Sequence, residues 1–124
     1  MINIFAIFIG GGLGSITRYG ISILLRANSL DFPLATLTVN IIGSLIMGFA
    51  IALFWNKVHI SHDTYKLAIT TGFCGGLTTF STFSWETFDL IKNGEFLLAI
   101  VYALISFLVC LLAISLGVFL SKYV

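Results

Sequence analysis

The sequence predicts an all-α membrane protein with four transmembrane helices in a single domain spanning residues 1–124. Two observations lead to this fold class. Apolar residues make up 59% of the chain and charged residues only 9%, whereas roughly 25% of the residues in soluble proteins are charged. The apolar residues, about 73 in all, nearly suffice for four helices of roughly 20 residues each, the length that crosses a bilayer.

Polar segments divide the chain into four apolar spans, which we expect at residues 2–25, 34–55, 67–91 and 96–120. The first two are separated by a polar segment that ends in the single proline, Pro33, a residue that favours helix starts. Residues 57–66 form the second connection and residues 92–95 the third. Connections this short make consecutive helices antiparallel.

Charge and side-chain chemistry exclude several classes of function. A net charge of +1 gives no basic surface for nucleic acid. His59 and His62 lie in a polar loop without a third metal ligand, and the spans contain no pair of nucleophile and base, so we expect no enzyme. Cys74 and Cys110 lie in apolar spans, where a thiol usually behaves as a small hydrophobic group. We therefore expect function within or at the surface of the membrane.

The basic residues are balanced between the two ends of the predicted bundle. One end carries Lys57, Lys66 and Lys122, and the other carries Arg18, Arg26 and Lys92. Because a bias in Lys and Arg sets the orientation of a membrane protein, a chain without bias is expected to insert both ways. Two inverted copies can then form an antiparallel homodimer, equivalent to an inverted repeat made from two chains. The alternative is that a weak bias still fixes one orientation.

Two spans carry polar stripes at intervals of four residues. They consist of Thr36, Asn40, Ser44 and Gly48 in the second span and Tyr102, Ser106 and Cys110 in the fourth. Polar groups at bilayer depth are costly unless they find partners or line a water-filled path. Asn40 therefore has two readings that the sequence leaves open: an interhelical hydrogen bond or an amide donor facing a pore.

The third span is unusually polar for a lipid-facing helix. Three glycines and seven Ser or Thr residues lie between Thr70 and Glu86. We expect Gly75-Gly76 to break the helix, and broken backbone is tolerated at this depth only inside protein or beside a cavity. Thr78 and Thr79 are expected to cap the second half-helix. The freed carbonyls suit a hard cation, and the N-terminus of the half-helix favours an anion.

Phe80 and Phe83 share one face of this second half-helix. The edge of an aromatic ring is positive, so these rings are candidates to contact a small anion in a pore, and packing is the alternative. Thr79, Thr82 and Glu86 lie on the adjoining face as a possible hydroxyl track toward an exit.

The first span carries one deep basic residue and a small-residue motif. Arg18 is expected to be a structural anchor, through snorkelling or a hydrogen-bonding fork, rather than an ion ligand. Gly10 and Gly14 have the spacing that allows close helix contact.

Residues 10–19, 36–43 and 72–84 resemble the Fluc/CrcB family of fluoride channels. The third of these segments, GFCGGLTTFSTFS, is very specific, and the resemblance extends over all four spans. It implies an antiparallel, dual-topology homodimer with two narrow pores that exports fluoride passively across a bacterial plasma (inner) membrane. It also implies a structural sodium ion at the centre of the dimer.

The resemblance also implies roles for individual residues. Asn40 matches the pore amide, and Phe80 and Phe83 match the pore phenylalanines. Gly75 and Thr78 match the positions whose backbone carbonyls, from both chains, hold the sodium ion. The polar track and vestibule of the fluoride pore are expected to include Thr36, Ser81, Thr82, Tyr102, Ser106 and Glu86. Cys110 is a departure, because serine is familiar at that place.

Two other classes of membrane protein compete with a fluoride channel. A small proton-coupled multidrug exporter also has four spans and dual topology, but it needs a carboxylate at depth, and the first two spans contain none. A scaffold subunit would use its polar stripes only for helix contacts. Fluoride leak through the purified protein in liposomes separates a scaffold from a channel.

Overall fold

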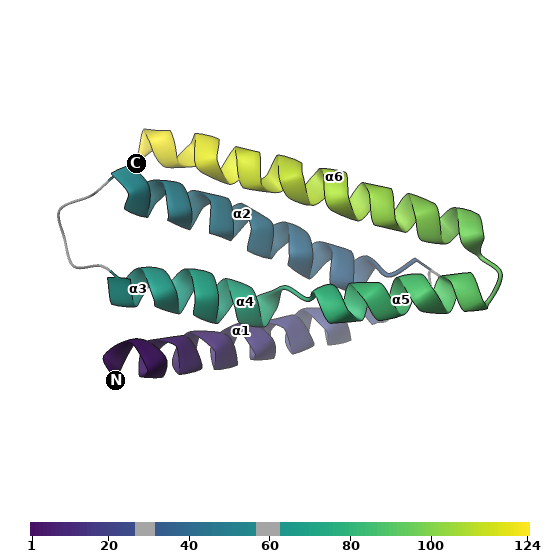
Figure 1. The fold of residues 1–124 in the computed structure, drawn as a ribbon, viewed down its shortest axis with the longest axis horizontal. Coiled ribbons are helices and arrows are strands. Elements are labelled where there is room, and N and C mark those ends of the chain that lie inside the picture. Colours follow the sequence, from purple (N-terminus) through teal and green to yellow (C-terminus); the bar gives the residue numbers. More distant parts are fainter. Residues whose placement is uncertain (27–31, 57–62) are drawn as a thin grey trace.

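In the computed structural model, the described residues are 1–26, 32–56 and 63–124, and all regular structure among them is helical. His59, His62 and Lys57 lie outside the described residues. Four helical rods lie side by side (Figure 1). The first two rods are α1 (Ile2–Arg26) and α2 (Leu34–Asn56). The third rod is interrupted and consists of α3 (Asp63–Leu67), the π-helix η1 (Ala68–Cys74), α4 (Gly75–Leu77) and α5 (Phe80–Lys92). The fourth rod is α6 (Phe96–Leu120), followed by the short 3₁₀ helix η2 (Ser121–Tyr123).

Three of the described helices are long and apolar enough to cross a membrane. They cover Ile2–Leu25, Leu34–Phe54 and Phe96–Tyr123, with mean hydropathies of 1.4, 2.2 and 3.0. The all-helical class is therefore confirmed, with a fourth rod that is divided into shorter pieces. The last connection turns at Gly94, whose φ of 84° is a conformation that suits glycine.

The predicted break in the third rod lies three residues later than expected. Gly75–Leu77 stays helical, and the backbone becomes extended at Thr78 (φ −79°, ψ 159°) and Thr79 (φ −151°, ψ 114°). Gly76 instead allows contact, because a side chain there would meet the backbone of Gly11 in α1. The prediction of a break at Gly75-Gly76 was thus wrong in position. Gly76 allows close packing, and hydroxyl and amide side chains hold the interruption at Thr78 and Thr79.

Helix α1 packs against η1 and α4 through glycines on both sides. A Cβ on Gly10 would collide with the backbone of Ala68, and one on Gly14 would collide with the backbone of Phe73. The predicted contact role of these two glycines is confirmed, since only a missing side chain lets the helices approach so closely.

Helices α2 and α6 run in the same direction and pack along their length (Figure 1). Gly48 in α2 lies against the backbone of Ile114, and Gly117 in α6 lies against that of Leu45. This close contact sets a register in which the polar stripes of the two helices face the same space.

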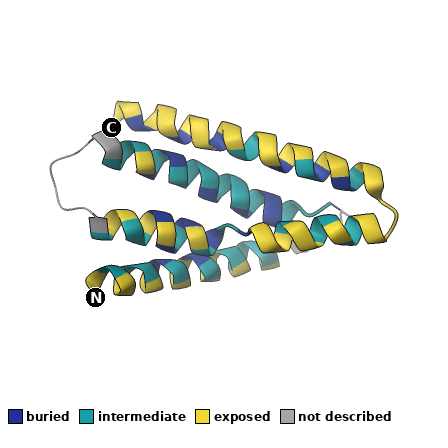
Figure 2. Cartoon of the chain, viewed as in Figure 1, coloured by how far each residue is buried: buried dark blue, intermediate teal, exposed yellow. Residues whose placement is uncertain are grey.

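The outer faces of the rods are exposed and apolar (Figure 2). Phe5, for example, is 64% exposed, whereas the fully buried large side chains include Tyr102, Leu77 and Val39. An apolar exterior around a small interior is the arrangement expected of a protein whose outer surface meets lipid or another copy of itself.

Candidate functional site

The break between α4 and α5 is held by Asn40 from α2. The backbone N–H of Thr79 donates to Asn40 Oδ1 over 2.8 Å, and Asn40 Nδ2 donates to the carbonyl of Thr79 over 3.3 Å. The first of these bonds replaces the helical partner that the Thr79 N–H loses where the backbone is extended. The interhelical reading of Asn40 is confirmed, and its Nδ2 carries a second N–H beyond the one used here.

The hydroxyls of Thr78 and Thr79 make hydrogen bonds at the ends of the two helices that flank the break. Thr79 Oγ1 accepts from the backbone N–H of Thr82 over 3.2 Å and so caps α5, as expected. It also donates to Thr82 Oγ1 over 2.9 Å and lies 3.3 Å from Ser81 Oγ. Thr78 does not cap α5; its hydroxyl donates backwards to the carbonyl of Cys74 over 2.8 Å.

Arg18 reaches the same break from α1. Its Nη1 donates to the carbonyl of Thr78 over 3.3 Å, a single hydrogen bond that agrees with the expected role as a structural anchor. Arg18 borders a cavity of about 330 Å³, which we call the arginine pocket. This pocket is lined by Ser15, Arg18, Tyr19, Ser22, Thr36, Val39, Thr79 and Thr82.

A second cavity, of about 430 Å³, also borders the break, and we call it the aromatic groove. Thr79 lines both cavities. The groove is lined by Asn40, Gly43, Ser44, Met47, Thr78, Thr79, Phe80, Phe83, Ser106, Phe107, Cys110 and Ile114. The facing polar stripes of α2 and α6 therefore contribute Asn40, Ser44, Ser106 and Cys110 to one space.

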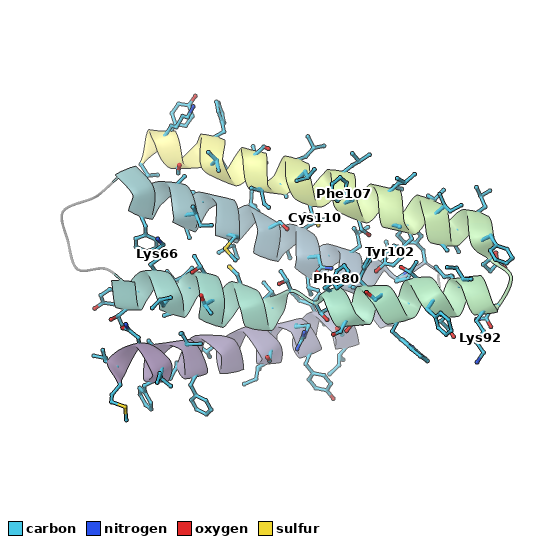
Figure 3. All side chains as sticks on the ribbon, in the orientation of Figure 1. Lys66, Phe80, Lys92, Tyr102, Phe107 and Cys110 are labelled. Carbon is cyan, nitrogen blue, oxygen red and sulfur yellow. The ribbon has the colours of Figure 1, made fainter. Side chains whose placement is uncertain are left out.

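The two phenylalanines differ in how far they are covered. Phe80 is 80% exposed, and its ring centroid lies 5.8 Å from that of Phe83. Phe83 packs on Tyr102 at 5.2 Å. Figure 3 shows Phe80 at the start of α5, beside the space that Phe107 and Cys110 approach from α6.

Glu86 joins three helices through its two carboxyl oxygens. Thr36 in α2 donates to Glu86 Oε1 over 2.7 Å, and the Tyr102 hydroxyl in α6 donates to Oε2 over 2.8 Å. Glu86 therefore fixes the position of two residues that the sequence assigned to the polar track.

Among the described residues, Ser106 has a buried hydroxyl oxygen that makes no hydrogen bond. The residue is 6% exposed and lines the groove. Sequence reasoning missed four other groove residues, Gly43, Met47, Phe107 and Ile114, because an apolar residue in an apolar helix carries no signal of its position. It also missed the contact of Arg18 with Thr78, which joins residues 60 positions apart.

The Gly75 carbonyl at the break is a candidate position for a cation. The N–H that would normally pair with the Gly75 carbonyl belongs to Thr79 and donates to Asn40 instead, and Gly75 is exposed. The Thr78 carbonyl accepts from the Arg18 guanidinium, which leaves it one lone pair. The described residues contain no cluster of three His, Cys, Asp or Glu that could hold a metal ion.

Comparison with known proteins identifies the chain's relatives. Residues 5–118 match the family described as CrcB-like protein, Camphor Resistance (CrcB). A protein of Serratia proteamaculans is 48% identical over 84% of this chain and 81% of its own length. One of Pyrococcus abyssi is 45% identical over 94% of this chain and 93% of its own length. Both are named fluoride-specific ion channel FluC. This chain therefore belongs to the CrcB family.

Proposed function

We propose that this protein is a channel that lets fluoride leave the cytoplasm passively across a bacterial plasma membrane. The relatives are named fluoride-specific ion channels, which are transporters rather than enzymes. The observation that carries the proposal is a pair of cavities beside the broken helix that share Thr79 in their linings, one bordered by Arg18 and the other by Cys110.

The groove offers fluoride the donors that it needs in place of water. A narrow pore must replace the hydration shell of the ion with several close contacts. Asn40 has a spare N–H, Ser106 has an uncommitted hydroxyl, and the edges of Phe80 and Phe83 are positive. These weak contacts bind the ion without trapping it.

Arg18 supplies positive charge beside the path rather than within it. The described lining of the aromatic groove contains no lysine or arginine, whereas Arg18 borders the arginine pocket. Its attachment to the Thr78 carbonyl fixes the guanidinium at the mouth of the break. The Arg18 charge thus attracts an anion to the arginine pocket. The anion then passes Thr79, Ser81 and Thr82 and enters the groove, where no full positive charge holds it.

A second, inverted copy completes each of two pores. Phe80 is 80% exposed although it lines the groove, which supports a partner that covers it. Lys66 and Lys92 lie at opposite ends of the third rod (Figure 3), in keeping with the balanced charge. Adding three lysines after Lys122 should force one orientation. Such a chain expressed alone should lose fluoride transport; normal transport would contradict the antiparallel homodimer.

A structural sodium ion fits this assembly in part. The open Gly75 carbonyl is a hard, neutral ligand of the kind that sodium accepts, and inversion would double each ligand of a site on the two-fold axis. The Thr78 carbonyl can contribute its second lone pair, although the Arg18 charge beside it weakens cation binding. The ion would neutralise the converging carbonyls and favour the assembled state.

The proposed function is tested by fluoride efflux from liposomes that contain the protein, measured beside chloride efflux. Phe80→Ile and Phe83→Ile keep apolar bulk and remove the ring edges, so each should reduce fluoride efflux sharply while the protein still folds. Phe5→Ile is the matched control, because Phe5 is 64% exposed on the outer face of α1. Wild-type efflux from both groove variants would show that the rings only pack.

A further inference from the structure

Cys110 gives the aromatic groove a chemical group that anion conduction does not require. It is a free, partly buried cysteine, and it lines the groove together with Ser44 and Ser106. Cys110 and Phe107, both labelled on α6 in Figure 3, line the groove from that helix. A thiol in such a space differs from serine mainly in its reactivity as a nucleophile.

Ser106 provides independent support for water or an ion at this level of the groove. It lies one helical turn from Cys110, is 6% exposed, and its hydroxyl oxygen has no hydrogen-bond partner. A buried hydroxyl without a partner is costly, and ordered water is the usual solution where a polar cavity has room. The groove, at about 430 Å³, has that room.

The other cysteine provides an internal contrast. Cys74 is 0% exposed and lies in η1, where it packs inside the chain and lines neither cavity described above. Cys74 is therefore the buried reference thiol, which a reagent should not reach by either the groove or the membrane.

We propose that Cys110 is a modification site for small, uncharged thiol-reactive sulfur compounds, and that the adduct obstructs the ion path. The part about obstruction rests on the proposed function, whereas the part about modification does not. The thiolate of a cysteine, rather than its thiol, is the nucleophile. The added group then occupies space between the stripes of α2 and α6.

The reaction with methyl methanethiosulfonate serves as the probe. The Cys110 thiol gives its proton to water, and the thiolate attacks the methylthio sulfur of the reagent. A new S–S bond forms between the cysteine and the methylthio group. The bond between that sulfur and the sulfonyl sulfur breaks, and its electron pair leaves with methanesulfinate. No net oxidant is needed, because the reagent itself carries the oxidised sulfur.

The test uses the full chain in liposomes and measures modification and transport separately. Intact mass should show one methylthio adduct on the wild type and on Cys74→Ser, and none on Cys110→Ser. Ser115→Cys, made in the Cys110→Ser background, is the matched control, because Ser115 is exposed on the outer side of α6. Without water around it, this thiol should react at least about tenfold more slowly than Cys110.

Fluoride efflux is compared before and after treatment of each protein. The wild type and Cys74→Ser should lose most of their own untreated rate, and Cys110→Ser should lose none. An adduct on Cys110 with unchanged efflux would show that the groove is not the ion path. Absence of an adduct, or equally fast reaction of the Ser115→Cys protein, would overturn the modification site. Absence of efflux from untreated protein would overturn the proposed function instead.

Discussion

Asn40→Leu removes both hydrogen bonds that hold the break in the third rod while it keeps the size of the side chain. The variant strands the N–H of Thr79, a residue that is 8% exposed, whereas the Thr79 carbonyl keeps the first backbone bond of α5, which Thr79 caps. A buried polar group left without its partner costs about 1–3 kcal/mol. The lost bond from Asn40 to the Thr79 carbonyl is long, at 3.3 Å, and adds little. We therefore expect the free energy of unfolding to fall by about 1–3 kcal/mol.

The assay is equilibrium unfolding by denaturant in detergent micelles, followed by circular dichroism at one fixed protein concentration. The concentration is fixed because an assembly unfolds at a denaturant level that depends on it. Asn3→Leu is the matched control: Asn3 Oδ1 accepts one bond, of 2.6 Å, from Thr64 near the end of the bundle. There the stranded hydroxyl can turn to other partners, so the expected loss is about 0.5–1.5 kcal/mol.

Fluoride efflux separates the structural role of Asn40 at the break from its role as a hydrogen-bond donor in the groove. Asn40→Leu should also reduce fluoride efflux, because it removes an N–H from the groove, whereas Asn3→Leu should leave efflux unchanged. An Asn40→Leu protein that unfolds within about 0.5 kcal/mol of the wild type, the usual range for a surface substitution, would refute the bracing of the break by these bonds.

Three further outcomes follow from the contacts. Tyr102→Phe should lower the free energy of unfolding by about 1–3 kcal/mol, because Glu86 loses a donor inside the protein, and Tyr123→Phe on the exposed surface should change it little. Gly14→Ala should destabilise the protein, since a Cβ would collide with backbone atoms, whereas Gly12→Ala meets nothing and should not; equal effects in the same unfolding assay would contradict the close contact of α1. Unfolding in sodium should require more denaturant than unfolding in N-methylglucamine, and identical curves would contradict the sodium ion.

The sequence by itself determined the class of the protein and most of its helices. Composition and the four apolar runs predicted an all-helical membrane protein, because the bilayer demands long apolar segments whatever their tertiary partners are. Three helices begin and end within one residue of their predicted bounds. The spacing of Gly10 and Gly14 predicted a close helix contact, because two glycines on one face leave room for a neighbouring helix whichever helix that is.

Only the tertiary structure decided where the third rod breaks and which polar groups meet. Glycine permits a break, but the helix is interrupted at Thr78 and Thr79, where Asn40 and Arg18 replace the missing backbone partners. The stripes of α2 and α6 were each visible in the sequence, yet their shared groove depends on the register between two helices. Contacts between residues far apart in the chain arise from packing, and periodicity within one helix cannot specify them.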